Sequence, residues 1–189
     1  MGKTKTGVVL ARMQPIHNGH LALIEKACSE NDEVFVFVGS ADKFNVRNPI
    51  PISVRMDLVK EATKILSDTY KNLTIVPLDD LSDESDNSHD WGFYLYTKIV
   101  NETGNPNFTI YYSDGFEIIT TWFPGFVLRN NVSLSLLARN SVEGGVSATA
   151  VRNMIVNNDD ENLKENVPTC VYDMRDSLRR YIDLSKTVR

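Results

Sequence analysis

Short apolar runs separated by helical patterns constrain the fold of this chain more than any other feature. Five runs rich in Val, Ile, Phe, Leu and Tyr are expected to form β-strands, at residues 7–11, 33–39, 72–78, 108–112 and 126–137. Several are continuously apolar, which is typical of strands covered on both faces in a parallel sheet. Helical patterns lie between them, at residues 21–30, 53–67 and 91–102. This alternation predicts β-α-β units and hence an α/β, doubly wound parallel sheet.

The C-terminal part of the chain is expected to be helical. Ser147 has the residue type of an N-cap for a helix running through Met154, and residues 159–180 follow a mostly helical pattern. A length of 189 residues is typical of one domain. We therefore expect a single domain over residues 1–189, with residues 155–189 as its C-terminal helical part.

Composition excludes several classes of function. The net charge of −5 argues against non-specific binding of nucleic acid, which needs concentrated Lys and Arg. No apolar stretch approaches the roughly 20 residues of a membrane helix, and the first residues lack the apolar core of a signal peptide. The two cysteines, Cys28 and Cys170, fit no metal-ligand spacing. We expect a cytoplasmic homo-oligomer that has neither nucleic acid nor membrane as a partner.

A His-Asn-Gly-His sequence directly behind the first strand is the strongest chemical signal. His17 and His20 are three residues apart on an opening helical turn, so their imidazoles project from the same side. That turn also presents unpaired N–H groups and the positive end of a helix dipole, which favour phosphate. Arg12 adds a guanidinium, and Gly19 allows close backbone approach. The alternative is a plain helix start with two exposed histidines.

A second anion-binding pattern lies near the end of the chain, after Gly144 and Gly145. Ser147 and Thr149 offer hydroxyl and N–H groups at a helix N-terminus, and Arg152 can reach back over that end. Alone, this pattern could be an ordinary capped helix. Together with the histidine pair it indicates a site that holds a nucleotide triphosphate between two helix starts.

These two motifs resemble those of the HxGH nucleotidyltransferase superfamily, whose members share a Rossmann-like fold. Within it the lead-in Arg12-Met13-Gln14-Pro15 most resembles the archaeal type of nicotinamide-mononucleotide adenylyltransferase. Gly39 and Ser40 are similar to the family's second-strand loop. Arg47 and Arg55 are similar to the segment that holds the mononucleotide phosphate, and Trp91 lies where the family places an aromatic that stacks on nicotinamide.

The resemblance implies transfer of AMP from ATP to nicotinamide mononucleotide by direct in-line attack, giving NAD and pyrophosphate. It implies catalytic roles for His17, His20 and Arg152. The implied ATP-binding residues are Arg12, Met13, Gln14, Pro15, Gly19, Ser147 and Thr149. The implied mononucleotide-binding residues are Gly39, Ser40, Arg47 and Trp91. Mg²⁺ is expected to arrive with ATP and keep its waters, so it needs few protein ligands.

Several alternatives stay open at this stage. The donor could be CTP, the acceptor could be another phosphorylated molecule, or the chain could be a non-catalytic nucleotide sensor. Trp91 could serve packing alone, and Arg139 could add to the anion site or be an exposed arginine. No Glu-rich helix pattern of the Nudix type follows Arg152, so we expect no fused hydrolase domain.

The acidic segment over residues 79–90 contains six Asp and Glu residues and no Lys or Arg. Such a segment is usually a solvated, mobile loop. A lid or a cation-binding role is the alternative. Asp79 and Asp80 could also orient an amide or a ribose, although such pairs at strand ends are mostly solvated.

Overall fold

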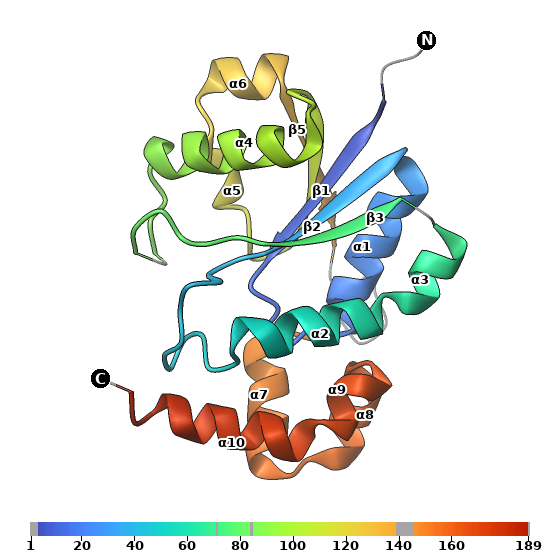
Figure 1. Ribbon diagram of the computed structural model, residues 1–189, viewed down its shortest axis with the longest axis vertical. Helices are drawn as coiled ribbons and strands as arrows, with labels where there is room; N and C mark the ends of the chain where they lie inside the picture. Colours follow the sequence, from blue (N-terminus) through green and yellow to red (C-terminus); the bar gives the residue numbers. More distant parts are fainter. Residues whose placement is uncertain (1–3, 71, 84, 139–145, 189) are drawn as a thin grey trace.

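Five parallel strands form the centre of the fold, in the order β3-β2-β1-β4-β5 (Figure 1). They are β1 Thr6–Ala11, β2 Glu33–Val38, β3 Leu73–Pro77, β4 Phe108–Ser113 and β5 Val132–Leu137. The computed structural model describes residues 4–70, 72–83, 85–138 and 146–188. Since β1 leads to β2 on one side and pairs with β4 on the other, the strand order reverses between β1 and β4. Open α/β sheets bind ligands at such a reversal, beyond the carboxyl ends of the strands.

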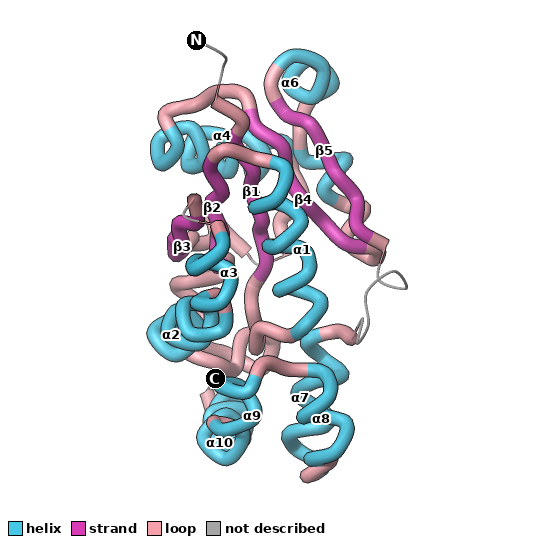
Figure 2. The backbone as a smooth tube through the Cα atoms, turned by 90° about the vertical axis from the view of Figure 1, so that its right-hand side faces the viewer, coloured by secondary structure: helices cyan, strands magenta, loops and turns pink. Residues whose placement is uncertain are grey.

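Helices cover both faces of the sheet. They are α1 Asn18–Glu30, α2 Ile52–Ala62, α3 Lys64–Thr69, α4 His89–Thr103, α5 Ile119–Trp122, α6 Gly125–Asn130, α7 Ala148–Asn157, α8 Asp160–Asn166, α9 Thr169–Asp173 and α10 Arg175–Ser185. One core cluster joins α1, α2 and the helices from α7 onward, and the other joins α4, α5 and α6. In Figures 1 and 2 the segment from α7 to α10 lies beside α2, at the end of the molecule opposite the N-terminus.

The central strand shows why the sequence lacks alternation. Val8 packs into the cluster with α4 to α6, Val9 packs into the cluster with α1 and α2, and both are 0% exposed. Successive side chains of a strand point to opposite faces, so a strand covered on both faces is apolar at every position. The predicted doubly wound parallel sheet is confirmed.

Local capping sets the helix boundaries near the sheet's carboxyl edge. The Ser147 hydroxyl accepts a hydrogen bond from the Ala150 N–H, which confirms it as the N-cap of α7. The Ser88 hydroxyl accepts from the Trp91 N–H in the same way at the start of α4. A Cβ built on Gly92 would lie 2.0 Å from the Trp122 carbonyl oxygen, so α4 and α5 can approach closely only because residue 92 has no side chain.

Two expectations from the sequence differ from the structure. The strand expected over residues 126–137 is wrong in its first part, because Gly125–Asn130 is helix α6 and only Val132–Leu137 is strand β5. The helix expected over residues 53–67 is broken, with α2 ending at Ala62 and α3 beginning at Lys64. A short apolar run does not distinguish strand from helix by periodicity, which explains the first error.

The helical expectation for residues 159–180 is confirmed by α8, α9 and most of α10. Within the described ranges, no helix has both the length and the apolar character needed to cross a membrane. The boundaries of the single predicted domain stay a prediction.

Candidate active site

A cavity of about 360 Å³ opens at the carboxyl ends of the strands. It is bounded by the loops that follow β1, β2 and β3, by the ends of β4 and β5, and by the first turns of α1 and α7. Every predicted site residue except Pro15 and Arg47 lines it: Arg12, Met13, Gln14, His17, Gly19, His20, Gly39, Ser40, Trp91, Ser147, Thr149 and Arg152. The cavity therefore brings together segments from the two ends of the chain.

The two histidines form one stacked unit at the start of α1. Their ring centroids are 3.7 Å apart, with an angle of 25° between the planes. The His17 backbone N–H donates to Nδ1 of His20 at 3.3 Å. Because Nδ1 of His20 accepts, the proton of the neutral ring is assigned to Nε2, which makes Nε2 a donor. A Cβ at Gly19 would lie 3.2 Å from the His17 ring, so glycine there leaves room for that ring.

Arg152 connects the two predicted phosphate motifs. Its Nη1 donates to the Gln14 carbonyl oxygen at 2.9 Å, and its Nη2 donates to Oγ1 of Thr149 at 3.1 Å. Burial lowers the pKa of Arg152, and the nearby positive charge of Arg12 lowers it further. Two guanidinium groups that repel each other at one cavity favour an anionic ligand between them.

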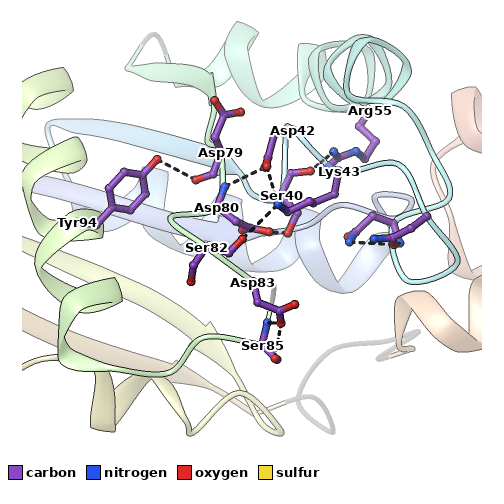
Figure 3. Close-up of polar contacts among 12 residues, drawn as sticks. Ser40, Asp42, Lys43, Arg55, Asp79, Asp80, Ser82, Asp83, Ser85 and Tyr94 are labelled. Atoms are coloured by element: carbon purple, nitrogen blue, oxygen red, sulfur yellow. Dashed lines mark hydrogen bonds and ion pairs between the residues drawn. The ribbon is translucent and has the colours of Figure 1, made fainter. Parts of the chain in front are cut away.

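The loops after β1 and β2 share an unusual backbone conformation. Met13 has φ of 51° and Ser40 has φ of 50°, the left-handed region that non-glycine residues rarely adopt. The Ser40 hydroxyl donates to Oδ1 of Asp80 at 3.1 Å (Figure 3). The buried Gln14 side chain accepts from the Ile50 N–H at 2.9 Å. These contacts tie the two strand ends to the loops beside them.

Pro15 and Arg47 are the two predicted residues that do not line the cavity. Pro15 is a buried residue of the loop that follows β1. Arg47 is exposed. Hydrogen bonds from Ser85 lower the pKa of Asp83, and the charge of Arg47 lowers it as well. The charge of Arg47 therefore acts on Asp83, which lines the cavity, although Arg47 itself does not line it.

Arg55 is absent from the cavity lining, although the resemblance placed it in the phosphate-holding segment. Its side chain is 0% exposed and donates to backbone carbonyl oxygens.

Trp91 is more buried than a stacking platform requires. It is 7% exposed, meets Trp122 edge-on at a centroid distance of 5.8 Å, and contacts Tyr94 at 5.6 Å. Only a small part of its indole reaches the cavity. Stacking on a ligand stays a prediction.

The acidic segment, for which the sequence favoured a solvated loop over a ligand-facing role, forms one wall of the cavity. Asp80, Asp83, Asp86 and Asn87 line it, although Asp79, Asp83 and Asn87 are exposed as expected of a solvated loop. Figure 3 shows how this wall is attached: Nζ of Lys43 donates to the Ser82 carbonyl oxygen at 3.2 Å and pairs with Asp42 at 2.7 Å.

The cavity is also lined by residues outside the predicted set: Tyr112, Ser113, Gly115, Phe116, Ile118 and Trp122. Their signal was positional, because most of them follow the carboxyl end of a strand. Glu84, Arg139, Gly144 and Gly145 lie outside the described residues. Across the described part of the chain, no three His, Cys, Asp or Glu side chains form a group that could hold a metal ion.

The fold and this cavity define a class of protein. The chain belongs to the cytidylyltransferase-like family, whose model matches residues 8–154. It is accordingly an enzyme of the nucleotidyltransferase class, and its resemblance to the HxGH superfamily is confirmed.

Its curated relatives identify the activity more closely. The chain is 30% identical over 146 residues to the nicotinamide-nucleotide adenylyltransferase of Thermococcus kodakarensis, covering 74% of each chain. It is 29% identical over 193 residues to the protein of the same name from Picrophilus torridus, covering 95% of this chain and 96% of that one. These archaeal relatives support nicotinamide-nucleotide adenylyltransferase activity.

Solved structures agree on the fold. A bifunctional NMN adenylyltransferase/ADP ribose pyrophosphatase from Francisella tularensis, complexed with AMP and a Mn ion, has a TM-score of 0.66 at 18% identity. It covers 97% of this chain, which spans about half of that protein, 52%. A putative nicotinate-nucleotide adenylyltransferase from Vibrio parahaemolyticus has a TM-score of 0.65 at 15% identity, with 96% and 97% of the two chains covered.

Proposed function

We propose that the protein transfers AMP from ATP to nicotinamide mononucleotide, forming NAD and releasing pyrophosphate. The observation that carries this proposal is the bond between Arg152 and the Gln14 carbonyl, which holds both phosphate motifs against one cavity. The archaeal relatives named for this activity support the same conclusion.

The reaction needs no covalent enzyme intermediate, because the attacking mononucleotide phosphate already carries negative charge. One of its oxygens attacks the α-phosphorus of ATP, and the bond to the bridging α–β oxygen breaks to release pyrophosphate. Catalysis then consists of positioning and charge stabilisation. His17 and His20 donate to the α- and β-phosphate oxygens, and Arg152 with the Ser147–Thr149 helix start holds the departing pyrophosphate.

The remaining predicted residues are proposed to bind the two substrates. Arg12, with the backbone of Met13 and Gln14, faces the ATP phosphates, and the buried Pro15 belongs to the same loop after β1. Gly39 and Ser40 let backbone approach the mononucleotide, and Arg47 binds its phosphate. Trp91 contributes its exposed edge to the mononucleotide side of the cavity.

Mg²⁺ is proposed to enter on ATP rather than in a protein cage. Mg²⁺ keeps several waters and is usually held by substrate phosphates with one or two carboxylates, so the described residues need no metal-binding cluster. When bound, it neutralises phosphate charge.

We further propose that the protein acts in the cytoplasm as a homo-oligomer, without nucleic acid or membrane partners. The acidic net charge of −5 supports the exclusion of nucleic acid.

A matrix of donors and acceptors tests the function. ATP or CTP is combined with nicotinamide mononucleotide, nicotinate mononucleotide or phosphopantetheine, and pyrophosphate release is measured. We expect the ATP and nicotinamide mononucleotide pair to give the highest kcat/KM. Preference for CTP or for phosphopantetheine would contradict the proposal. Binding of ATP without release in any combination would instead identify a nucleotide sensor.

A further inference from the structure

Arg55 is a fully buried arginine that reaches the carboxyl ends of two strands from α2. Its side chain donates four hydrogen bonds, all to backbone carbonyl oxygens. Nη1 donates to Arg12 and to Gly39, each at 2.7 Å, while Nη2 donates to Ser40 at 2.9 Å and Nε donates to Ile50 at 2.9 Å. Figure 3 shows the guanidinium beside the loop of Ser40.

The two carbonyl groups that accept from Nη1 of Arg55 directly precede the two residues with a left-handed backbone conformation. The Arg12 carbonyl belongs to the peptide before Met13, and the Gly39 carbonyl belongs to the peptide before Ser40. Non-glycine residues persist in this conformation only where the surroundings hold them there. Nη1 of Arg55 therefore holds the turns at Met13 and Ser40 together. Residues 12–14 and 39–40 of these turns also line the cavity.

Stability alone does not account for this arrangement. A buried cation is costly unless it is well compensated, and the four hydrogen bonds of Arg55 are all with neutral carbonyls. Burial, and after it the nearby positive charge of Arg12, lower the pKa of Arg55 to about 10, while the charge of Asp80 opposes them. At neutral pH the group is therefore charged, and its charge lies behind the cavity wall where phosphate is proposed to bind.

We propose that Arg55 is a positioning residue for nucleotidyl transfer. It holds the turns at Met13 and Ser40 so that the two strand-end loops present their backbone to the phosphates of both substrates. This inference rests on the proposed function. It reassigns Arg55 from phosphate contact to control of the loops that make the contact.

The test compares Arg55→Ala with Leu58→Ala. Leu58 is on the same helix, is 2% exposed and packs in the core, but its apolar side chain cannot donate hydrogen bonds to the loop carbonyls. At a temperature where both variants are folded by circular dichroism, we expect Arg55→Ala to lower kcat about 100-fold, the loss that a small misplacement of reacting groups causes. Leu58→Ala should lower the melting temperature but leave kcat close to that of the wild type.

Chemical rescue separates positioning from general damage. Guanidinium chloride at low, non-denaturing concentration should restore part of the activity of Arg55→Ala, since it can refill the space with a planar cation that donates to the carbonyls. Urea and potassium chloride should not. Equal kcat for wild type and Arg55→Ala, a loss matched by Leu58→Ala, or absence of rescue would overturn the inference. If Arg55→Ala does not fold, Arg55→Lys is compared in the same way, without rescue.

Measuring ATP affinity distinguishes failure of the positioning role of Arg55 from failure of the proposed function. A wild-type protein that releases no pyrophosphate overturns the proposed function. Calorimetry with ATP alone then tests Arg55, for which we expect the alanine variant to bind roughly tenfold more weakly and Leu58→Ala to bind like the wild type. Equal ATP affinity in Arg55→Ala and the wild type would overturn the positioning role.

Discussion

The guanidinium of Arg152 donates a 2.9 Å hydrogen bond to the carbonyl oxygen of Gln14, which lies 138 positions earlier in the chain. This contact joins the first turns of α7 to the loop after β1. It brings the two motifs that are predicted to bind phosphate to one cavity.

Replacing Arg152 with Lys tests that connection. Lys keeps the charge but not the planar fork that bonds Gln14 and Thr149 together. We expect kcat/KM for ATP to fall roughly 10- to 100-fold, in line with the loss of one or two charge-assisted hydrogen bonds. Arg179→Lys is the matched control, because Arg179 also bonds a backbone carbonyl and a side chain, at Ile155 and Asp176. Equal losses in both variants would argue against a role for Arg152 at the site.

The His20→Ala variant tests the proposed phosphate donor. Loss of one donor to the transition state should lower kcat by about 10²–10³, while the stability of the fold should change little because His20 is not in the buried core. His89→Ala is the control, since His89 is exposed at the start of α4 and does not line the cavity. Steady-state pyrophosphate release measures both. If His20→Ala turns over as fast as His89→Ala, the assigned role is wrong.

Gly19→Ala should separate activity from stability. Alanine is the better helix former by about 0.5–1 kcal/mol, so the melting temperature should hold or rise. Its Cβ would lie 3.2 Å from the His17 ring, which must then shift and carry the stacked His20 with it. We expect kcat to fall about tenfold or more, because catalysis depends on this alignment. At Gly125 the added Cβ meets the flexible end of Arg129 at the same distance, so Gly125→Ala should keep full activity.

Gly92→Ala should destabilise the fold. The new Cβ would lie 2.0 Å from the Trp122 carbonyl oxygen, so α4 must move away from α5. Overpacking of this kind costs about 1–3 kcal/mol or more in the free energy of unfolding, which urea denaturation measures. Thr97→Ala on the exposed face of α4 is the control. A Gly92→Ala protein as stable as the wild type would show that the two helices are not in close contact.

The sequence predicted the sheet well because its strands are buried on both faces, as Val8 and Val9 illustrate. The N-cap at Ser147 was predictable because its signal is local. Helix α6, at residues 125–130, was not predictable. Phe126 and its apolar neighbours are typical of a strand, but they form a helix in which Phe126 is 55% exposed.

The site was predictable in its motifs but not in its walls. The family resemblance placed Arg55 in the segment that holds the mononucleotide phosphate, whereas the structure buries its side chain completely. Its burial depends on which backbone carbonyls the folded loops direct at it. The acidic segment likewise looks solvated in sequence, and only the packing of the loop after β3 brings Asp80 and Asp86 to the cavity.

The most direct test follows the α-phosphate of ATP. The protein is incubated with ATP labelled at the α-phosphorus, nicotinamide mononucleotide and Mg²⁺, and the products are separated. We predict that the label appears in NAD and that pyrophosphate is released unlabelled in equal amount. Label that remains in ATP, or that appears as free AMP while nicotinamide mononucleotide is recovered unchanged, would contradict adenylyl transfer by this protein.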